Sequence, residues 1–117
     1  MNKTIFCDID GTLLKHYGGL HPIFISQPVA LPNVHKCIAA WKDKDYTIVL
    51  TTGRPESMRD MTVQQLAYAG IFYDKLITGL PRGPRIIIND TKPDCDVTAT
   101  AINIPRNQGF SQEHFEI

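Results

Sequence analysis

The chain has 117 residues, with 12 basic and 12 acidic side chains and a formal net charge of zero. This length suits one domain, 1–117, with a modest core. The charge balance supplies no basic surface for nucleic acid or an anionic membrane, so we expect neither as a partner. No apolar run reaches the length of a membrane span, and the three cysteines are odd in number and widely spaced (Cys7, Cys37 and Cys95). We therefore expect no disulfide framework and a reducing, cytoplasmic compartment.

An apolar, β-branched run near the N-terminus ends in two acids. Residues 4–7 are followed by Asp8, Ile9 and Asp10, and then by Gly11 and Thr12. In a strand, residues two apart point the same way, and the carboxyl ends of buried strands line the ligand crevice of open α/β sheets. Two carboxylates held there repel, so a divalent cation or a phosphate-binding Lys or Arg is expected beside them. A calcium loop fits poorly because the glycine comes too early, whereas an Asx-type turn with solvated acids stays open as a structural alternative.

The next segment, 13–27, is predicted to form a short flap. Gly18 and Gly19 separate two β-leaning arms and are typical of a hairpin turn. His16 and His21 lie in these arms, where they either contact a substrate or are solvated loop side chains.

A helix followed by a buried strand comes after the flap. Val34, Ile38 and Trp41 recur at i, i+4 and i+7, which predicts one core-facing helix stripe beginning near Asn33. Residues 46–50 then form an apolar strand of the parallel, buried kind.

That second strand runs into Thr51, Thr52, Gly53 and Arg54. A hydroxyl at a strand end beside a helix N-terminus adds a hydrogen-bond donor where backbone N–H groups already favour an anion. Arg54 either reaches a substrate or pairs on the surface. A second helix is predicted over 55–69, with proline in its first turn and glycine after its end.

The rest of the chain is predicted to contain three more strands. They cover 75–78, the isoleucine run 86–88, and an edge strand at 98–104. The run 86–88 is followed by Asn89 and Asp90, which repeats the pattern of a buried strand ending in an acid. The polar tail, about 105–117, has no readable role.

Three of these motifs carry a resemblance. Asp8-x-Asp10-Gly-Thr-Leu, Thr52-Gly53-Arg54 and Asp90, each at a predicted strand end, are similar to the first, second and fourth signatures of the haloacid dehalogenase superfamily. Members of that superfamily are mostly magnesium-dependent phosphatases. The resemblance implies a three-layer Rossmann-like α/β domain with a mainly parallel sheet, a short flap after the first strand and no cap domain.

The resemblance also implies roles for the residues. Asp8 would attack phosphorus to form an aspartyl phosphate, and Asp10 would be the general acid and base. Mg²⁺ would be bound by Asp8, Asp10 and Asp90. The phosphoryl group would be bound by Thr52, Gly53, Arg54 and one further cation.

The third signature is where this sequence departs from the family. Relatives with a short connection here usually offer a lysine just before a proline, and Leu80 occupies that place. Arg82 is our first choice for the missing cation, since an arginine supplies a bidentate phosphate contact. Other cations nearby in the sequence are Arg85, Lys75 and Lys92.

The sequence therefore predicts a Mg-dependent phosphomonoester hydrolase acting on a small phosphorylated metabolite such as a sugar phosphate. Three alternatives stay open. The first is a non-catalytic phosphate- or Mg-binding module, which is suggested by Leu80 in place of the expected lysine. The second is a phosphatase acting on a nucleic-acid end, and the third is a phosphotransferase or mutase. The sequence also leaves open whether a second copy of the chain covers the capless crevice.

Overall fold

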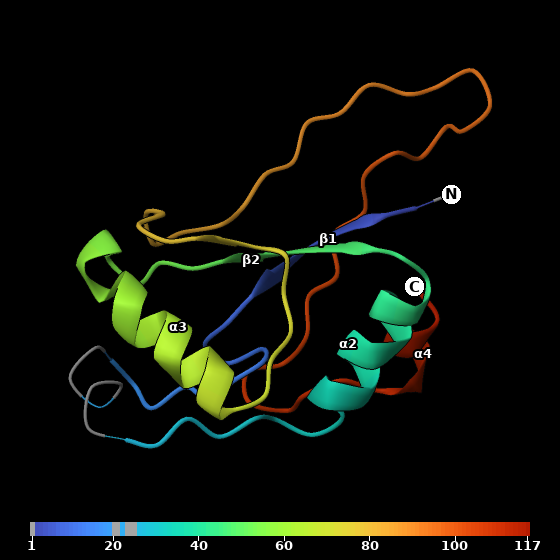
Figure 1. Cartoon of the computed structure of the whole chain (residues 1–117). Helices are drawn as coiled ribbons and strands as arrows, with labels where there is room; N and C mark the ends of the chain where they lie inside the picture. The colour runs from blue at the N-terminus through green and yellow to red at the C-terminus, as the bar shows by residue number, and fades with distance from the viewer. Residues whose placement is uncertain (1, 20–21, 23–25) are drawn as a thin grey trace.

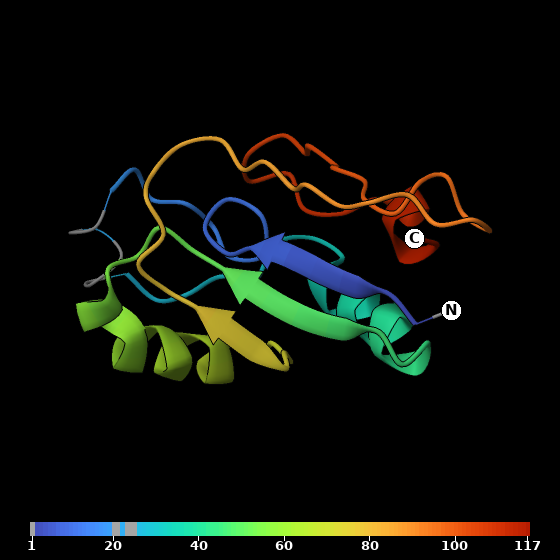
Figure 2. The same cartoon turned by 90° about the horizontal axis from the view of Figure 1, so that it is seen from above.

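The computed structural model describes residues 2–19, 22 and 26–117. Its centre is a parallel three-stranded sheet in the order β1 (Thr4–Asp8), β2 (Thr47–Thr51) and β3 (Lys75–Ile77). Figure 2 looks onto this sheet and shows the three strands side by side. A parallel sheet with helical crossovers and no cap domain among the described residues is the predicted α/β class, which is confirmed.

The strand register brings the ends of the strands together. Asp8 pairs with Thr51, and Thr51 pairs in turn with Ile77. All three strands therefore end at the same edge of the sheet, the edge at which parallel sheets present ligand-binding groups.

Both long helices lie on one face of the sheet. Helix α2 (Val34–Asp43) and helix α3 (Arg59–Tyr68) follow β1 and β2, and α3 is preceded by the short helix η1 (Glu56–Met58). The predicted stripe of α2 is buried, and it joins one core with Leu66 of α3 and the inward-facing strand residues Cys7, Ile48, Leu50 and Leu76. Figure 1 shows both helices on the same side of the strands. Burial of this apolar stripe, rather than helix propensity, is what fixes the two helices.

The C-terminal tail docks against α2. The Phe110 ring meets Trp41 edge-on at 5.5 Å between centroids, and the Trp41 indole N–H donates to the His114 carbonyl at 3.0 Å. Helix α4 (Gln112–Phe115) lies in this stretch, beside α2 (Figure 1). The aromatic pair therefore attaches the tail, whose role the sequence left open, to the core.

The two strands predicted at 86–88 and 98–104 are wrong. Neither segment is a strand, and Ile86 and Ile88 are 85% and 90% exposed. Residues 84–103 form an extended segment that runs away from the side of the sheet carrying α2 and α3 (Figure 1). The apolar run has the composition of a buried strand, but no described element covers it.

The predicted flap is only partly described, because residues 20, 21 and 23–25, including His21, lie outside the described residues. At its base Leu14 bridges Ala30 in antiparallel fashion. The Tyr17 hydroxyl donates to the carbonyl of Gln27 at 3.0 Å, which joins the two ends of the segment. Among the described residues, no helix combines the length and the apolar character needed to cross a membrane.

Candidate active site

Asp8 and Asp10 lie on either side of the point where β1 ends. Asp8 is the last residue of β1, and the chain then turns tightly, with the N–H of Gly11 donating to Leu14 O at 2.7 Å and that of Leu13 to Ile9 O at 2.8 Å. Gly11 has φ 88°, a left-handed conformation that glycine adopts without strain. This turn fixes both carboxylates at the carboxyl edge of the sheet.

Several groups act on the Asp8 carboxylate in opposite directions. Desolvation by its surroundings raises the pKa of Asp8, and the Asp10 charge raises it further. The Thr12 hydroxyl, which donates to Asp8 Oδ2 at 3.2 Å, the Ile9 N–H and the Arg85 charge all lower it. The net effect is a raised pKa, so the surroundings partly oppose ionisation of the proposed nucleophile.

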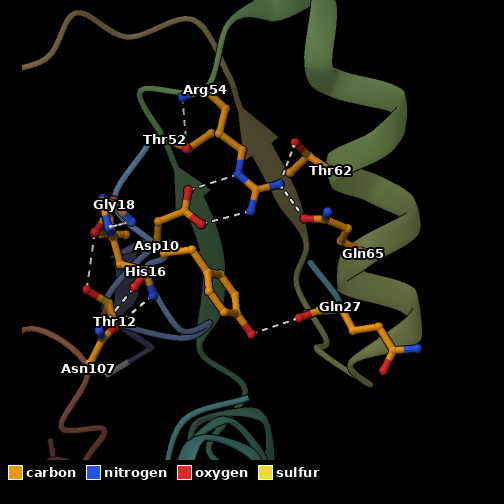
Figure 3. Close-up of polar contacts among 12 residues, drawn as sticks. Asp10, Thr12, His16, Gly18, Gln27, Thr52, Arg54, Thr62, Gln65 and Asn107 are labelled. Carbon is orange, nitrogen blue, oxygen red and sulfur yellow. Dashed lines mark hydrogen bonds and ion pairs between the residues drawn. The ribbon is translucent and has the colours of Figure 1, made fainter. Parts of the chain in front are cut away.

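Arg54 holds Asp10 by both carboxylate oxygens. Arg54 Nε donates to Asp10 Oδ2 and Nη2 donates to Oδ1, each at 2.8 Å. The other terminal nitrogen, Nη1, donates to the Thr62 hydroxyl at 3.1 Å and to Gln65 Oε1 at 2.7 Å. Figure 3 shows the guanidinium between Asp10 on one side and these two α3 side chains on the other. Arg54 is 3% exposed, so the ion pair is shielded from solvent and held in one geometry.

The end of β2 supplies the next part of the site. Thr52 is 1% exposed, and its hydroxyl oxygen accepts the Arg54 backbone N–H at 3.1 Å. Gly53 lies beside the following loop, where a Cβ on it would be 3.5 Å from Leu80 O and 3.7 Å from Arg82 Cγ. Arg82 therefore lies next to the Thr-Gly-Arg turn.

The candidate cations divide into two groups. Arg82 lies beside Gly53, and Arg85 is near enough to Asp8 for its charge to lower the pKa of that carboxyl. Arg85 also donates to the carbonyls of Pro81 and Gly83, at 3.0 and 2.6 Å. By contrast, Lys92 is paired with Asp90, and Lys75 is the first residue of β3, at the strand end away from the carboxyl edge. Arg82 and Arg85 are therefore the two of these four cations that lie beside the site.

The structure does not bring Asp90 to Asp8 and Asp10. Asp90 lies in the exposed segment 84–103, where both its carboxylate oxygens accept from Lys92 Nζ at 2.8 Å. Within the part of the chain that is described, no group of three His, Cys, Asp or Glu side chains could hold a metal ion. The three-carboxylate set expected for Mg²⁺ is therefore not assembled, because the strand that was to carry Asp90 to the sheet edge is absent.

Three residues that contact this site have no signal in the sequence motifs. Thr62 and Gln65 bind Arg54, and their place one turn apart on α3 is readable only once Arg54 is known to point at that helix. Asn107 accepts from the His16 N–H at 2.7 Å and donates to His16 O at 3.2 Å, while its own N–H donates to Gly11 O at 2.8 Å (Figure 3). This contact spans 91 positions, so local patterns could not have revealed it.

The match to one protein family agrees with the motif at β1. The family model for haloacid dehalogenase-like hydrolases matches residues 5–74, more than half of the chain. A chain of the Pnkp1/Rnl/Hen1 complex superposes with a TM-score of 0.58 and 26% identity over 73% of this chain. The D,D-heptose 1.7-bisphosphate phosphatase from B. bronchiseptica, complexed with magnesium and phosphate, gives a TM-score of 0.47 and 25% identity over 70% of this chain. This chain spans 30% of the first of these proteins and 51% of the second, and no curated protein matches it.

Proposed function

Because the chain belongs to the haloacid dehalogenase-like hydrolase family, we propose that it hydrolyses phosphomonoesters of small metabolites such as sugar phosphates. Asp8 is the nucleophile and Asp10 is the general acid and base. The observation that carries this proposal is the placement of Asp10, which lies two residues beyond Asp8 and is held by a buried arginine through two hydrogen bonds of 2.8 Å. A carboxylate that serves only as a solvated turn residue needs no such support.

The reaction takes place in two steps. Asp10 enters the first step as a carboxylic acid, its proton replacing one of the two hydrogen bonds from Arg54. An Asp8 carboxylate oxygen forms a bond to phosphorus, the bond from phosphorus to the ester oxygen breaks, and the Asp10 proton passes to the departing oxygen. In the second step Asp10 takes a proton from water, the water oxygen bonds to phosphorus, and the bond to Asp8 breaks to release inorganic phosphate. Each step is a displacement at phosphorus, so no oxidant or reductant is required.

Polar groups around Asp8 support the phosphoryl group. Arg82 and Arg85 provide positive charge beside Asp8 and the Thr-Gly-Arg turn, and Thr52 and Gly53 form the end of β2 at the same edge. Positive charge fixed in place before reaction stabilises the charge that develops on the phosphoryl oxygens. The guanidinium of Arg54 is engaged with Asp10, Thr62 and Gln65, so we assign it to Asp10 in place of the phosphate contact expected from the sequence.

Magnesium, the cofactor expected from the family, would neutralise phosphoryl charge when bound. Asp8 and the Asp10 backbone carbonyl are suitable oxygen donors for it. The third expected donor, Asp90, lies elsewhere, so the described residues do not fit the expected metal site, and no step above depends on a metal.

Hydrolysis of p-nitrophenyl phosphate by the wild-type chain tests the proposal, with and without Mg²⁺ or EDTA. We expect turnover that Asp8→Asn abolishes. Silence of the wild type on a broad panel of phosphate esters, with phosphate still bound, would instead establish the non-catalytic binding module that Leu80 suggests.

A further inference from the structure

Asn107, in the C-terminal tail, holds the loop after β1 (residues 9–16) at two points. Its backbone N–H donates to Gly11 O at 2.8 Å. Its side-chain amide accepts the His16 N–H through Oδ1 at 2.7 Å and donates to His16 O through Nδ2 at 3.2 Å (Figure 3). One residue of the tail therefore binds the loop that carries Asp10 both directly after that residue and at the far end of the loop.

The contact at Gly11 restrains the peptide next to Asp10. Gly11 follows Asp10 directly, and its N–H donates to Leu14 O at 2.7 Å while its carbonyl oxygen accepts from Asn107. Glycine has the widest choice of backbone conformations of any residue, so a glycine alone fixes no turn. The hydrogen bonds on both of its backbone groups are what hold the chain after Asp10 in one conformation.

The part of the tail around Asn107 is itself attached to the start of α2. The Phe110 N–H donates to Pro32 O at 3.0 Å, and Asn33 Nδ2 donates to Phe110 O at 2.8 Å. Between these contacts and Asn107, Gly109 packs directly against the Pro32 backbone. A donor on an anchored segment restrains the group that it binds, whereas a donor on a free segment would only move with it.

Asp10 then has one support for its side chain and another for its backbone. Arg54 binds the two carboxylate oxygens, each at 2.8 Å, and Asn107 binds the loop from which the side chain projects. The direction set by Arg54 is productive only if the Asp10 backbone is fixed as well, because a catalytic group must be held within about 0.5 Å of its working position. Asn107 therefore acts through Asp10 and not on the substrate.

We infer that Asn107 is a positioning residue for Asp10, which it serves by fixing the backbone of the loop after β1. The inference rests on the proposed function, because the effect of Asn107 on the reaction is assigned to proton transfer by Asp10. It adds to the proposed machinery a residue that lies 91 positions after the His16 to which it binds.

Asn107→Gly, made in the full-length protein, removes the two side-chain contacts and little else. Asn107 has φ 63°, which glycine adopts without strain, and the backbone N–H that binds Gly11 O is retained. Asn33→Gly is the matched control. Asn33 has φ 65°, and its side chain is bonded to Phe110 O in the tail and not to the loop after β1. Both variants thus lose an asparagine side chain from the same backbone conformation.

The two variants should differ in how their activity depends on the leaving group. For glucose 6-phosphate, an alkyl ester, Asn107→Gly should lower kcat/KM by about 10- to 100-fold and leave inhibition by inorganic phosphate nearly unchanged. The loss should be smaller for p-nitrophenyl phosphate, because its leaving group needs less protonation. Asn33→Gly should lower the Tm and leave kcat/KM for both esters unchanged. Equal losses for the two esters in Asn107→Gly, or the same losses in Asn33→Gly, would overturn the inference.

Amide hydrogen exchange tests the support of the loop independently of catalysis. In Asn107→Gly the Gly11 N–H should exchange faster by about fivefold or more, the factor expected for the loss of one hydrogen bond, and in Asn33→Gly its rate should be unchanged. A wild type that hydrolyses no ester would refute the proposed function, and the exchange rate of Gly11 would then decide whether Asn107 holds the loop. An unchanged rate in Asn107→Gly would overturn the inference in either case.

Discussion

Arg54 and Asp10 form a buried, bidentate ion pair, and the remaining terminal nitrogen of Arg54 is hydrogen-bonded to helix α3. Both bonds measure 2.8 Å, and Thr62 and Gln65 occupy the nitrogen that faces away from Asp10. The orientation of the proposed general acid is therefore set by a helix that does not itself carry a catalytic group. Such support is what limits a catalytic carboxylate to one productive geometry.

Removing this support should impair proton transfer more than phosphate binding. Arg54→Lys cannot hold both oxygens in a planar fork, and we expect kcat to fall by about 100-fold with inhibition by inorganic phosphate nearly unchanged. The loss should be smaller for p-nitrophenyl phosphate than for an alkyl phosphate, because a good leaving group needs less protonation. Arg59→Lys, which affects an arginine bonded to Leu76 O, is the control. A rise in KM for phosphate, with no dependence on the leaving group, would show that Arg54 instead contacts the phosphoryl group.

Asp8→Asn should abolish hydrolysis and also stabilise the fold at neutral pH. The folded-state pKa of Asp8 is raised, so between the unfolded and folded pKa values the folded chain holds more protons than the unfolded one. Stability due to Asp8 is therefore lost as the pH rises through this window, and the neutral amide avoids that loss. Thermal melts of both proteins should give a higher Tm for the variant at pH 7 and a shrinking difference below about pH 4. A lower Tm for the variant at pH 7 would contradict the raised pKa.

The exposed isoleucines give a direct test of the segment 84–103. Ile86→Ala and Ile88→Ala should each change the free energy of unfolding by less than about 0.5 kcal/mol, because both side chains are already in water. Ile48→Ala, at a fully buried position, should cost about 2–5 kcal/mol. Urea unfolding curves measure all three. A cost near that of Ile48→Ala at either exposed position would show that the run is buried in solution, as the sequence predicted.

Gly109 should tolerate no side chain. Its φ is 77°, and a Cβ there would lie 2.3 Å from the Pro32 carbonyl oxygen. Because backbone atoms cannot move aside cheaply, we expect Gly109→Ala to destabilise the fold by more than about 2 kcal/mol. Gly19→Ala, whose added Cβ would be 3.9 Å from Pro22 Cδ, is the control. Equal melting temperatures for the two variants would show that the tail does not pack as described.

Local patterns were sufficient for elements whose buried residues recur regularly along the sequence. The stripe Val34, Ile38 and Trp41 predicted α2, and the apolar run ending at Asp8 predicted β1, because burial imposes a period on each. The run 86–88 shows where this reasoning fails. Apolar composition indicates that a segment prefers burial, but it does not supply the partner that buries it.

The residues of the candidate site likewise include some that the sequence predicts and some that it does not. The placement of Asp8, Asp10 and Thr52 at one edge of the sheet could be predicted, because each lies at or just beyond the end of a strand and parallel strands share that edge. The partnership of Arg54 with Asp10 could not be predicted, since it depends on the side-chain direction of Arg54 and on residues of α3. The placement of Asp90 failed together with the strand that was to carry it.

The hydrogen bonds from Asn107 to His16 and Gly11 also limit when, during synthesis, the loop after β1 can reach its final structure. A ribosome produces the chain from the N-terminus, so Gly11 and His16 emerge long before Asn107, which lies 91 positions after His16. The strand that carries Asp8 can pair with β2 as soon as both have emerged, but the loop after it lacks these hydrogen bonds until Asn107 has left the exit tunnel. The loop that carries Asp10 should therefore reach its final geometry only after Asn107 has emerged.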